Sequence, residues 1–288
     1  MSKIVILGCE NSHANTFLNY VRDNPQYKDV EVIGVYSDEE EAVKKLVEEY
    51  GVPAMKSYDE AVGKVDGVVI TARHGDNHYK YAKPYIESGV PMFIDKPITI
   101  SEAEAIEFMQ VCIKNGVRLT GGSCCKDNSW VLDLKKEHEE SVGGKTIGGY
   151  VRAPINLNNV YGGFYFYTQH LVETVTTIFG CYPESVYARQ NGKTLSVLFH
   201  YDGFTVDGLF TEESWNYYAM RQAMDGEKGG FFPVAEGFTR EFHEFYELLV
   251  GEKQKGSYED FIAPVFVMNA IERSLANGKE EKVNKYSL

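Results

Sequence analysis

Short apolar segments alternate with amphipathic segments from Met1 to about Gly122. The apolar runs are rich in Val and Ile and are bounded by Gly, Pro or polar residues, which predicts buried parallel strands. The segments between them carry apolar residues at helical spacing and predict helices. We expect strands over residues 3–8, 30–36, 54–56, 65–71, 91–94 and 117–120, and helices over 11–22, 38–50, 58–62, 78–88 and 101–115.

Polar residues and glycines mark where these predicted helices begin and end. Asp38 is a candidate N-cap and Gly51 a stop signal, while Ser101 with Glu104 three residues later forms a capping box before a helix that ends at Gly116. Regular alternation of strand and helix implies a parallel sheet covered on both faces. Since crossovers are right-handed, the doubly wound α/β fold is the leading topology.

The pattern changes after residue 122. Predicted strands over 147–154, 185–190, 194–201 and 204–210 are mixed with predicted helices over 128–140, 165–179, 238–249 and 258–276. Strands and helices without strict alternation predict an α+β domain. We therefore expect domains at 1–122 and 123–288, with the last helices as candidates to pack back on the first domain.

Composition restricts the partners. The net charge of −13 argues against nucleic acid and anionic membranes, which need clustered Lys and Arg. No apolar run reaches the roughly 20 residues that span a bilayer. The five Cys include no C-x-x-C pair, which predicts free thiols in a reducing cytoplasm. With nucleic acid and membranes disfavoured, we expect a small-molecule substrate as the partner.

The loop after the first predicted strand is a candidate phosphate-binding turn. In a G-x-G-x-x-G loop, backbone N–H groups and a helix N-terminus meet a pyrophosphate. Only the first glycine, Gly8, is present, and Glu10 and His13 stand at the other two positions. The alternative is a tight turn without a ligand. The candidate contacts are Gly8, Cys9, Asn11, Ser12 and His13.

The end of the second predicted strand carries Ser37 and Asp38, where an acid normally binds the adenosine ribose. Asp38 has the alternative role of a helix cap. Glu39 and Glu40 follow, so a 2′-phosphate would meet negative charge. NAD is therefore favoured over NADP.

Two further strand ends collect polar residues at the carboxyl edge of the predicted sheet, where open α/β folds bind ligands. They span residues 70–78 and 93–97. The candidate cofactor contacts here are Thr71, Ala72, Arg73, His74, His78, Asp95 and Lys96. His74 and His78 are four residues apart, but Gly75 lies between them and no third ligand follows, so we predict no metal site.

Several spaced motifs resemble one family. Asp95-Lys96-Pro97 is similar to a strand-terminal Glu-Lys-Pro, His78 matches a helical His, and Gly162-Gly163 precedes a helix that carries His170. Together with the closing segment over residues 238–283, these motifs resemble the Gfo/Idh/MocA oxidoreductases, the group of glucose-fructose oxidoreductase and inositol dehydrogenase. The resemblance implies a Rossmann domain, a second domain with a large open antiparallel sheet, and a homodimer or homotetramer.

The resemblance also implies an NAD(P)-dependent redox step on a sugar, polyol or related hydroxy compound. A hydroxyl that loses hydride also loses its proton, and His170 is the candidate base. Lys96 is the candidate group that stabilises the alkoxide, with Tyr167 as a proton partner. The candidate substrate contacts are Lys126, Asn128, Tyr165 and His170. Core packing and a polar interdomain loop are the alternatives for the tyrosines and for Lys126 and Asn128.

The sequence departs from the family pattern in three places: the degraded glycine loop, Asp95 in place of Glu, and Phe166 in place of an Asp four residues before His170. Two other functions therefore stay open. One is a catalytically impaired relative that binds a dinucleotide or sugar as a sensor or partner subunit. The other is a lyase or hydrolase that uses NAD transiently.

Overall fold

Five parallel strands form the N-terminal sheet, in the order β2-β1-β3-β4-β5. The computed structural model describes residues 1–287. The chain runs from β1 to β2 and then crosses to β3 on the other side of β1, so the winding reverses between β1 and β3. This is the predicted doubly wound fold. The strands are β1 (Ser2–Leu7), β2 (Val30–Tyr36), β3 (Gly67–Ile70), β4 (Met92–Asp95) and β5 (Leu119–Gly122).

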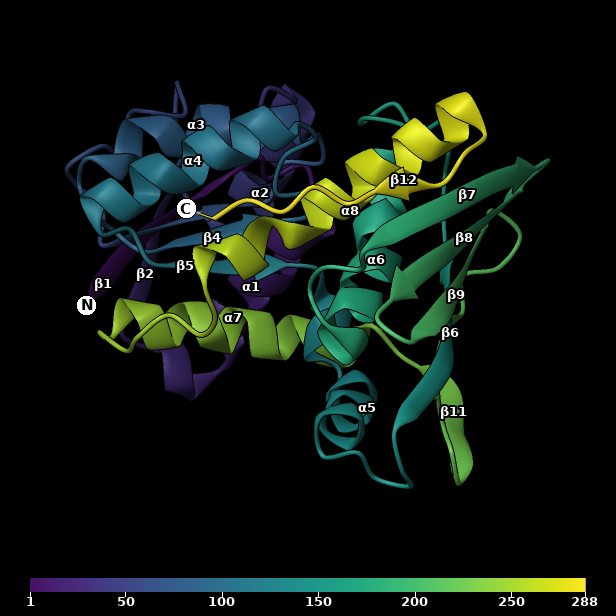
Figure 1. Cartoon of the computed structure of the whole chain (residues 1–288). Helices are drawn as coiled ribbons and strands as arrows, with labels where there is room; N and C mark the ends of the chain where they lie inside the picture. Colours follow the sequence, from purple (N-terminus) through teal and green to yellow (C-terminus); the bar gives the residue numbers. More distant parts are fainter. Residues whose placement is uncertain (288) are drawn as a thin grey trace.

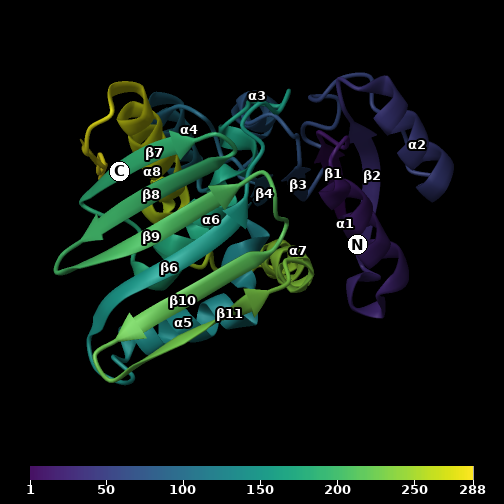
Figure 2. The ribbon, with the colours of Figure 1, turned by 90° about the vertical axis from the view of Figure 1, so that its right-hand side faces the viewer.

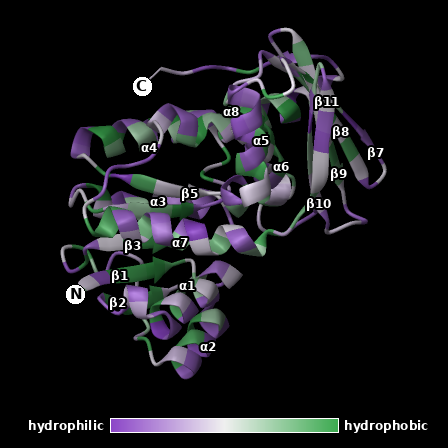
Figure 3. Cartoon of the chain, turned by 90° about the horizontal axis from the view of Figure 1, so that it is seen from below, coloured by the Kyte–Doolittle hydropathy of each residue, from purple (hydrophilic) through white to green (hydrophobic). Residues whose placement is uncertain are grey.

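Helices cover both faces of this sheet (Figure 1). Successive β1 side chains point to opposite faces, so Ile4 and Ile6 join one apolar core with Phe17, and Val5 and Leu7 join another. In Figure 3 the ribbon of β1 is coloured as hydrophobic, whereas the ribbon of α2 carries both hydrophobic and hydrophilic residues. The helices of this part are α1 (Ser12–Asp23), η1 (Pro25–Tyr27), α2 (Glu40–Tyr50), α3 (Asp76–Ile86) and α4 (Glu102–Asn115).

A second sheet of seven strands follows, in the order β11-β10-β6-β9-β8-β7-β12. Only β6 and β9 pair in parallel in this sheet as the structure describes it; the other neighbours are antiparallel. Helices α5 and α6 lie behind the sheet, and its front face is open in Figure 2. The elements are η2 (Cys124–Asp127), α5 (Ser129–Glu139), β6 (Thr146–Pro154), α6 (Tyr165–Phe179), β7 (Ser185–Asn191), β8 (Thr194–Tyr201), β9 (Phe204–Thr211), β10 (Tyr217–Ala223) and β11 (Gly226–Phe232).

The last two helices pack back on the N-terminal sheet. Helix α7 (Ala235–Leu249) places Phe242 and Phe245 in the core that contains β1 and α1. Helix α8 (Tyr258–Asn277) packs against α4, α6 and β7, and β12 (Glu281–Lys282) then pairs with β7. Across residues 1–287, none of the helices combines the length and apolar character needed to cross a membrane.

Three local predictions are wrong. Residues 54–56 form an isolated bridge between Val35 and Ala54 instead of a strand, and residues 58–62 form turns instead of a helix. Helix α2 begins at Glu40 after Glu39, so Asp38 is not its cap. The Asp38 carboxylate instead accepts hydrogen bonds from the hydroxyls of Tyr36 and Tyr81, which hold it away from the helix N-terminus.

The sequence pattern also misses the hairpin of β10 and β11. Strand β11 contains three glycines and two charged residues and is largely exposed, so it lacks the apolar alternation of a half-buried strand. Strand β10 buries alternate residues against α5, with the indole of Trp130 donating to the Ala219 carbonyl at 3.2 Å.

Candidate active site

Gly8 forms the turn at the point where the winding of the sheet reverses. Its φ of +77° is in the left-handed region, and a Cβ at this position would lie 2.3 Å from the backbone N and Cα of Ala72. The loops after β1 and β3 therefore touch in a way that only glycine permits. Thr71 strengthens the contact, since its hydroxyl donates to the Gly8 carbonyl at 3.0 Å.

Glu10 bridges the carboxyl ends of β2 and β3, beside the point where the winding reverses, and open α/β folds bind ligands in the crevice outside such strand ends. One carboxylate oxygen accepts from the Ser37 hydroxyl at 2.7 Å and the other accepts from the Arg73 N–H at 2.8 Å. A glycine at this position of a dinucleotide loop lets the backbone approach the pyrophosphate. Gly8 thus fits a dinucleotide as it stands, whereas Glu10 fits one only if its carboxylate turns out of the crevice.

The other predicted residues of the loop divide between the interior and the surface. Asn11 and His13 are 8% and 5% exposed and face inward, whereas Ser12 is exposed. Asn11 donates to the Asp95 carboxylate at 2.7 Å. Cys9 is also buried, and burial is the main cause that raises the pKa of its thiol to about 12. The Cys9 side chain is therefore a neutral thiol at neutral pH.

A loop of the C-terminal domain reaches the far end of the crevice. The Tyr161 hydroxyl donates to Glu39 at 2.9 Å and accepts from the Arg73 guanidinium at 3.1 Å. The guanidinium also lies 5.0 Å from the centre of the Tyr161 ring, within the range of a cation–π contact. Tyr161 therefore links both sides of the crevice near Ser37 and Asp38.

His78 and His74 have different positions. His78 is fully buried, and its ring nitrogens lie 2.6 Å from the Pro97 carbonyl and 2.7 Å from the Ala72 carbonyl. It therefore connects the loops that follow β3 and β4. His74 is partly exposed, and its Nδ1 accepts from the Asp76 N–H at 3.3 Å.

Lys96 is buried at the end of β4, with 4% exposure. Its ammonium donates to the Phe166 carbonyl at 3.1 Å and lies 4.1 Å from the centre of the Phe166 ring. Burial is the main cause that lowers the pKa of Lys96, against the opposing effect of Asp95. A lysine with a lowered pKa exchanges protons more readily near neutral pH.

His170 lies on α6 with 6% exposure. Its Nδ1 is 2.7 Å from the Ser123 hydroxyl and 3.7 Å from the Cys125 sulfur. Burial, assisted by the nearby Lys96, lowers the pKa of His170 well below its usual value, so the ring is neutral at pH 7. The Tyr167 ring centre lies 5.6 Å from that of His170 and 5.2 Å from the Lys96 ammonium, so the three predicted catalytic residues lie together.

Three residues that position this cluster, Gln169, Glu173 and Ser123, were not predicted. Gln169 accepts from the Ile98 N–H at 3.1 Å and donates to Glu173 at 2.8 Å. Glu173 also accepts from the Ser123 N–H at 2.8 Å. These bonds fasten α6 to the ends of both β4 and β5, which fixes His170 relative to Lys96. Gln169 and Glu173 are four residues apart on a buried helix, and this spacing could have indicated that they contact each other.

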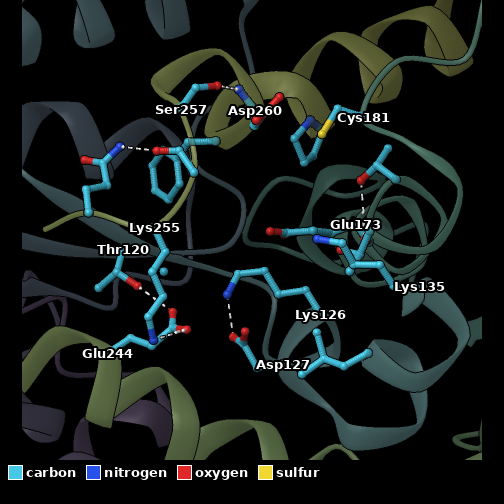
Figure 4. Close-up of a pocket in the computed structure, with 18 of the residues that line it drawn as sticks. Thr120, Lys126, Asp127, Lys135, Glu173, Cys181, Glu244, Lys255, Ser257 and Asp260 are labelled. Atoms are coloured by element: carbon cyan, nitrogen blue, oxygen red, sulfur yellow. Dashed lines mark hydrogen bonds and ion pairs between the residues drawn. The ribbon is translucent and has the colours of Figure 1, made fainter. Parts of the chain in front are cut away.

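The remaining predicted substrate contacts have other partners. Lys126 pairs with Asp127 in a cavity of about 480 Å³ between β5 and helices α5 to α8 (Figure 4). Asn128 caps α5 and donates to the Pro233 carbonyl at 2.7 Å. Tyr165 donates to Glu272 on α8 at 2.8 Å. The structure gives these three residues contacts that differ from those of the group around Lys96 and His170.

The reversal of winding between β1 and β3, with a buried lysine and histidine nearby, is typical of folds with a dinucleotide-type parallel sheet. Residues 2–123 match a family model described as the oxidoreductase family, NAD-binding Rossmann fold, of the Gfo/Idh/MocA group. The N-terminal part of the chain is therefore similar to the Gfo/Idh/MocA oxidoreductases, as its motifs predicted.

Other proteins share parts of the sequence or the fold. The uncharacterized oxidoreductase YhhX of Escherichia coli (strain K12) is 26% identical over 121 residues, which are 39% of this chain and only 35% of that protein. A putative myo-inositol dehydrogenase from Sinorhizobium meliloti 1021 superposes with a TM-score of 0.83 at 16% identity, covering 99% of this chain and 100% of that one. GenD2 from gentamicin A biosynthesis, in complex with NAD, gives 0.85 at 14% identity, with 98% and 96% covered. At these identities the two structures establish a common fold.

Proposed function

We propose that this protein is an NAD-dependent oxidoreductase that removes hydride from a CH–OH group of a polyol, sugar or related compound. The observation that carries this proposal is the buried group of Lys96, His170 and Tyr167 at the carboxyl edge of the dinucleotide-type sheet, in which Lys96 and His170 both lie close to the Tyr167 ring. The NAD complex of GenD2 and the inositol dehydrogenases with the same fold support it.

The residues that would hold the dinucleotide lie along the crevice. Gly8 and the adjacent loop would face the pyrophosphate, and Ser37 and Asp38 the adenosine ribose. The carboxylates of Asp38 and Glu39 would repel a 2′-phosphate, which favours NAD over NADP. When bound, the nicotinamide supplies the acceptor for the hydride.

The protein's own residues handle the proton. If the Nδ1–H of His170 donates to the Ser123 hydroxyl, Nε2 carries the lone pair that accepts the substrate's hydroxyl proton. The lowered pKa keeps this base unprotonated at neutral pH. The Lys96 ammonium stabilises the alkoxide as the proton leaves. Burial raises the pKa of Tyr167, so its hydroxyl serves as a hydrogen-bond donor and not as a base.

A catalytically impaired relative that only binds a dinucleotide or a sugar is the second candidate. Two observations favour it: Phe166 replaces the carboxylate beside Lys96, and the Glu10 carboxylate lies across the crevice.

In either case we propose a homodimer or homotetramer formed through the open face of the second sheet, where Leu198 and Leu209 are partly exposed (Figure 2).

The test is calorimetric titration with NAD⁺, NADH and NADPH, followed by NADH absorbance assays on a panel of inositols, sugars and linear polyols. Binding of NAD⁺ with turnover that is lost in His170→Asn supports the proposed function. Binding without turnover across the panel favours the second candidate. Failure of all three dinucleotides to bind would overturn the proposal.

A further inference from the structure

Three metal-type ligands from distant parts of the sequence meet beneath the crevice. His13 on α1, Cys124 in η2 and Glu241 on α7 each bring one ligand atom within 4.8 Å of the other two. Their exposures are 5%, 1% and 0%. An imidazole, a thiolate and a carboxylate in one buried place form a mixed ligand set of the kind that binds zinc.

The imidazole of His13 lies between the carboxylates of Asp95 and Glu241, yet these contacts lack the geometry of hydrogen bonds. Among residues 1–287, neither carboxylate oxygen of Glu241 and neither ring nitrogen of His13 makes a hydrogen bond of acceptable geometry. His13 Nε2 nevertheless lies 3.3 Å from a Glu241 oxygen. A buried carboxylate without a donor is costly, so such an arrangement points to a bound group that satisfies it.

We propose that His13, Cys124 and Glu241 bind a Zn²⁺ ion. Zinc bonds of about 2.0–2.3 Å in a tetrahedron place neighbouring ligand atoms about 3.3–3.8 Å apart. The 3.3 Å separation of His13 Nε2 and Glu241 Oε2 falls in this range. Neither Glu241 oxygen makes a hydrogen bond among the described residues, so a carboxylate bound through both of them would raise the number of donor atoms to four.

Asp95 contacts the ring nitrogen of His13 that faces away from Glu241. Its Oδ2 lies 3.1 Å from His13 Nδ1, on the side of the ring away from Glu241. A metal-binding histidine usually directs its second nitrogen to a carboxylate, which fixes the tautomer and the ring orientation. Asn11 in turn donates to the same Asp95 oxygen at 2.7 Å. The carboxylate therefore holds the ring so that Nε2 faces the ion.

Close helix packing brings the ligands together. A Cβ at Gly237 would lie 2.0 Å from the Cys124 carbonyl oxygen, so α7 approaches η2 more closely than any other residue would permit. Glu241 lies four residues later on the same face of α7. Cys124 also neighbours Cys125 and His170 in a second group of ligand atoms, but His170 Nδ1 is already bonded to Ser123.

The first experiment measures zinc in protein purified without chelator, by mass spectrometry of the metal. We expect about one zinc per chain. The ion is then removed and Co²⁺ is titrated, since a thiolate ligand produces a charge-transfer band. Cys124→Ser is expected to lose this band and Glu241→Gln to weaken binding at least about tenfold, since even loss of an outer partner costs that much. Cys125→Ser is the matched control and is expected to keep the band.

Thermal unfolding of the wild-type protein gives an independent readout. Zn²⁺ is expected to raise its melting temperature, because an ion that binds only the folded state stabilises it. Glu241→Gln is expected to show a much smaller rise. Wild-type protein with no zinc and no cobalt band would overturn the proposal. Loss of the band in Cys125→Ser with its retention in Cys124→Ser would also overturn it, as would a failure of Zn²⁺ to shift the wild-type melting temperature.

Discussion

The Lys96 ammonium lies against the face of the Phe166 ring, 4.1 Å from its centre, and donates to the carbonyl of the same residue at 3.1 Å. A ring face and a carbonyl attract a cation without carrying a full negative charge. The lysine is therefore buried against neutral partners on this side, and burial lowers its pKa. The missing carboxylate at Phe166 thus affects the charge of Lys96 directly.

Phe166→Asp is expected to raise the pKa of Lys96. A carboxylate within a few ångströms favours the charged amine, by about one pH unit or more. The measurement is a pH titration of the Lys96 side-chain carbon by NMR in lysine-labelled protein. Phe166→Asn is the control, since it removes the ring without adding charge. Equal titration curves for the two variants would contradict the electrostatic explanation.

Glu10→Gln is expected to tighten NADH binding about tenfold, which corresponds to about 1.4 kcal/mol. The Glu10 carboxylate spans Ser37 and Arg73 across the crevice, so a bound pyrophosphate would meet its negative charge. Calorimetry measures the affinity. Glu48→Gln makes the same charge change on the exposed part of α2 and should leave the affinity unchanged. A weaker affinity for Glu10→Gln would show that the carboxylate helps to build the site.

Most strands of the N-terminal sheet could be predicted from the sequence because the central strands are buried on both faces. Runs such as residues 4–7 are then apolar throughout, and Gly8 marks the end of this one. The hairpin of β10 and β11 was missed because it lies at an open edge, where glycines and charges are tolerated.

The candidate catalytic group was predictable only in part. Lys96 and His170 belong to motifs with recognisable neighbours, and they do lie together. The partners of His13 could not be predicted, since Asp95 on β4 and Glu241 on α7 lie far from it in the sequence and meet it only through the packing of the sheet and of α7. The direction of the Lys126 side chain is likewise set by its ion pair with Asp127, and the sequence does not show that these neighbours pair with each other.

Gly8→Ala is expected to destabilise the fold by about 3 kcal/mol or more. The substitution combines a strained left-handed backbone, about 1–2 kcal/mol, with a collision against the Ala72 backbone. Gly51→Ala is the matched control, since Gly51 has a φ of +69° but open space around its Cβ position. Urea unfolding should show a loss of only about 1 kcal/mol for the control. Similar losses of unfolding free energy in both variants would mean that the collision with Ala72 does not contribute to the destabilisation.

Glu173→Gln is expected to remove a pH dependence of folding stability. Burial is the main cause that raises the pKa of Glu173 from 4.5 to about 7, and Lys126 on η2 opposes it while Asp127 reinforces it. Between these two pH values the folded state binds more protons than the unfolded state, so this group's contribution to stability falls as pH rises. A neutral glutamine has no such titration.

The measurement is the free energy of unfolding in urea from pH 4.5 to pH 8. The advantage of Glu173→Gln over the wild type should grow through the window up to about pH 7 and then level off, at a size on the order of 3 kcal/mol. The amide oxygen can still accept from the Ser123 N–H, so the fastening of α6 to β5 is retained. Glu139→Gln, on the exposed face of α5, makes the same substitution outside the core and is the matched control. A flat difference for Glu173→Gln would mean that the buried carboxylate is already ionised at low pH.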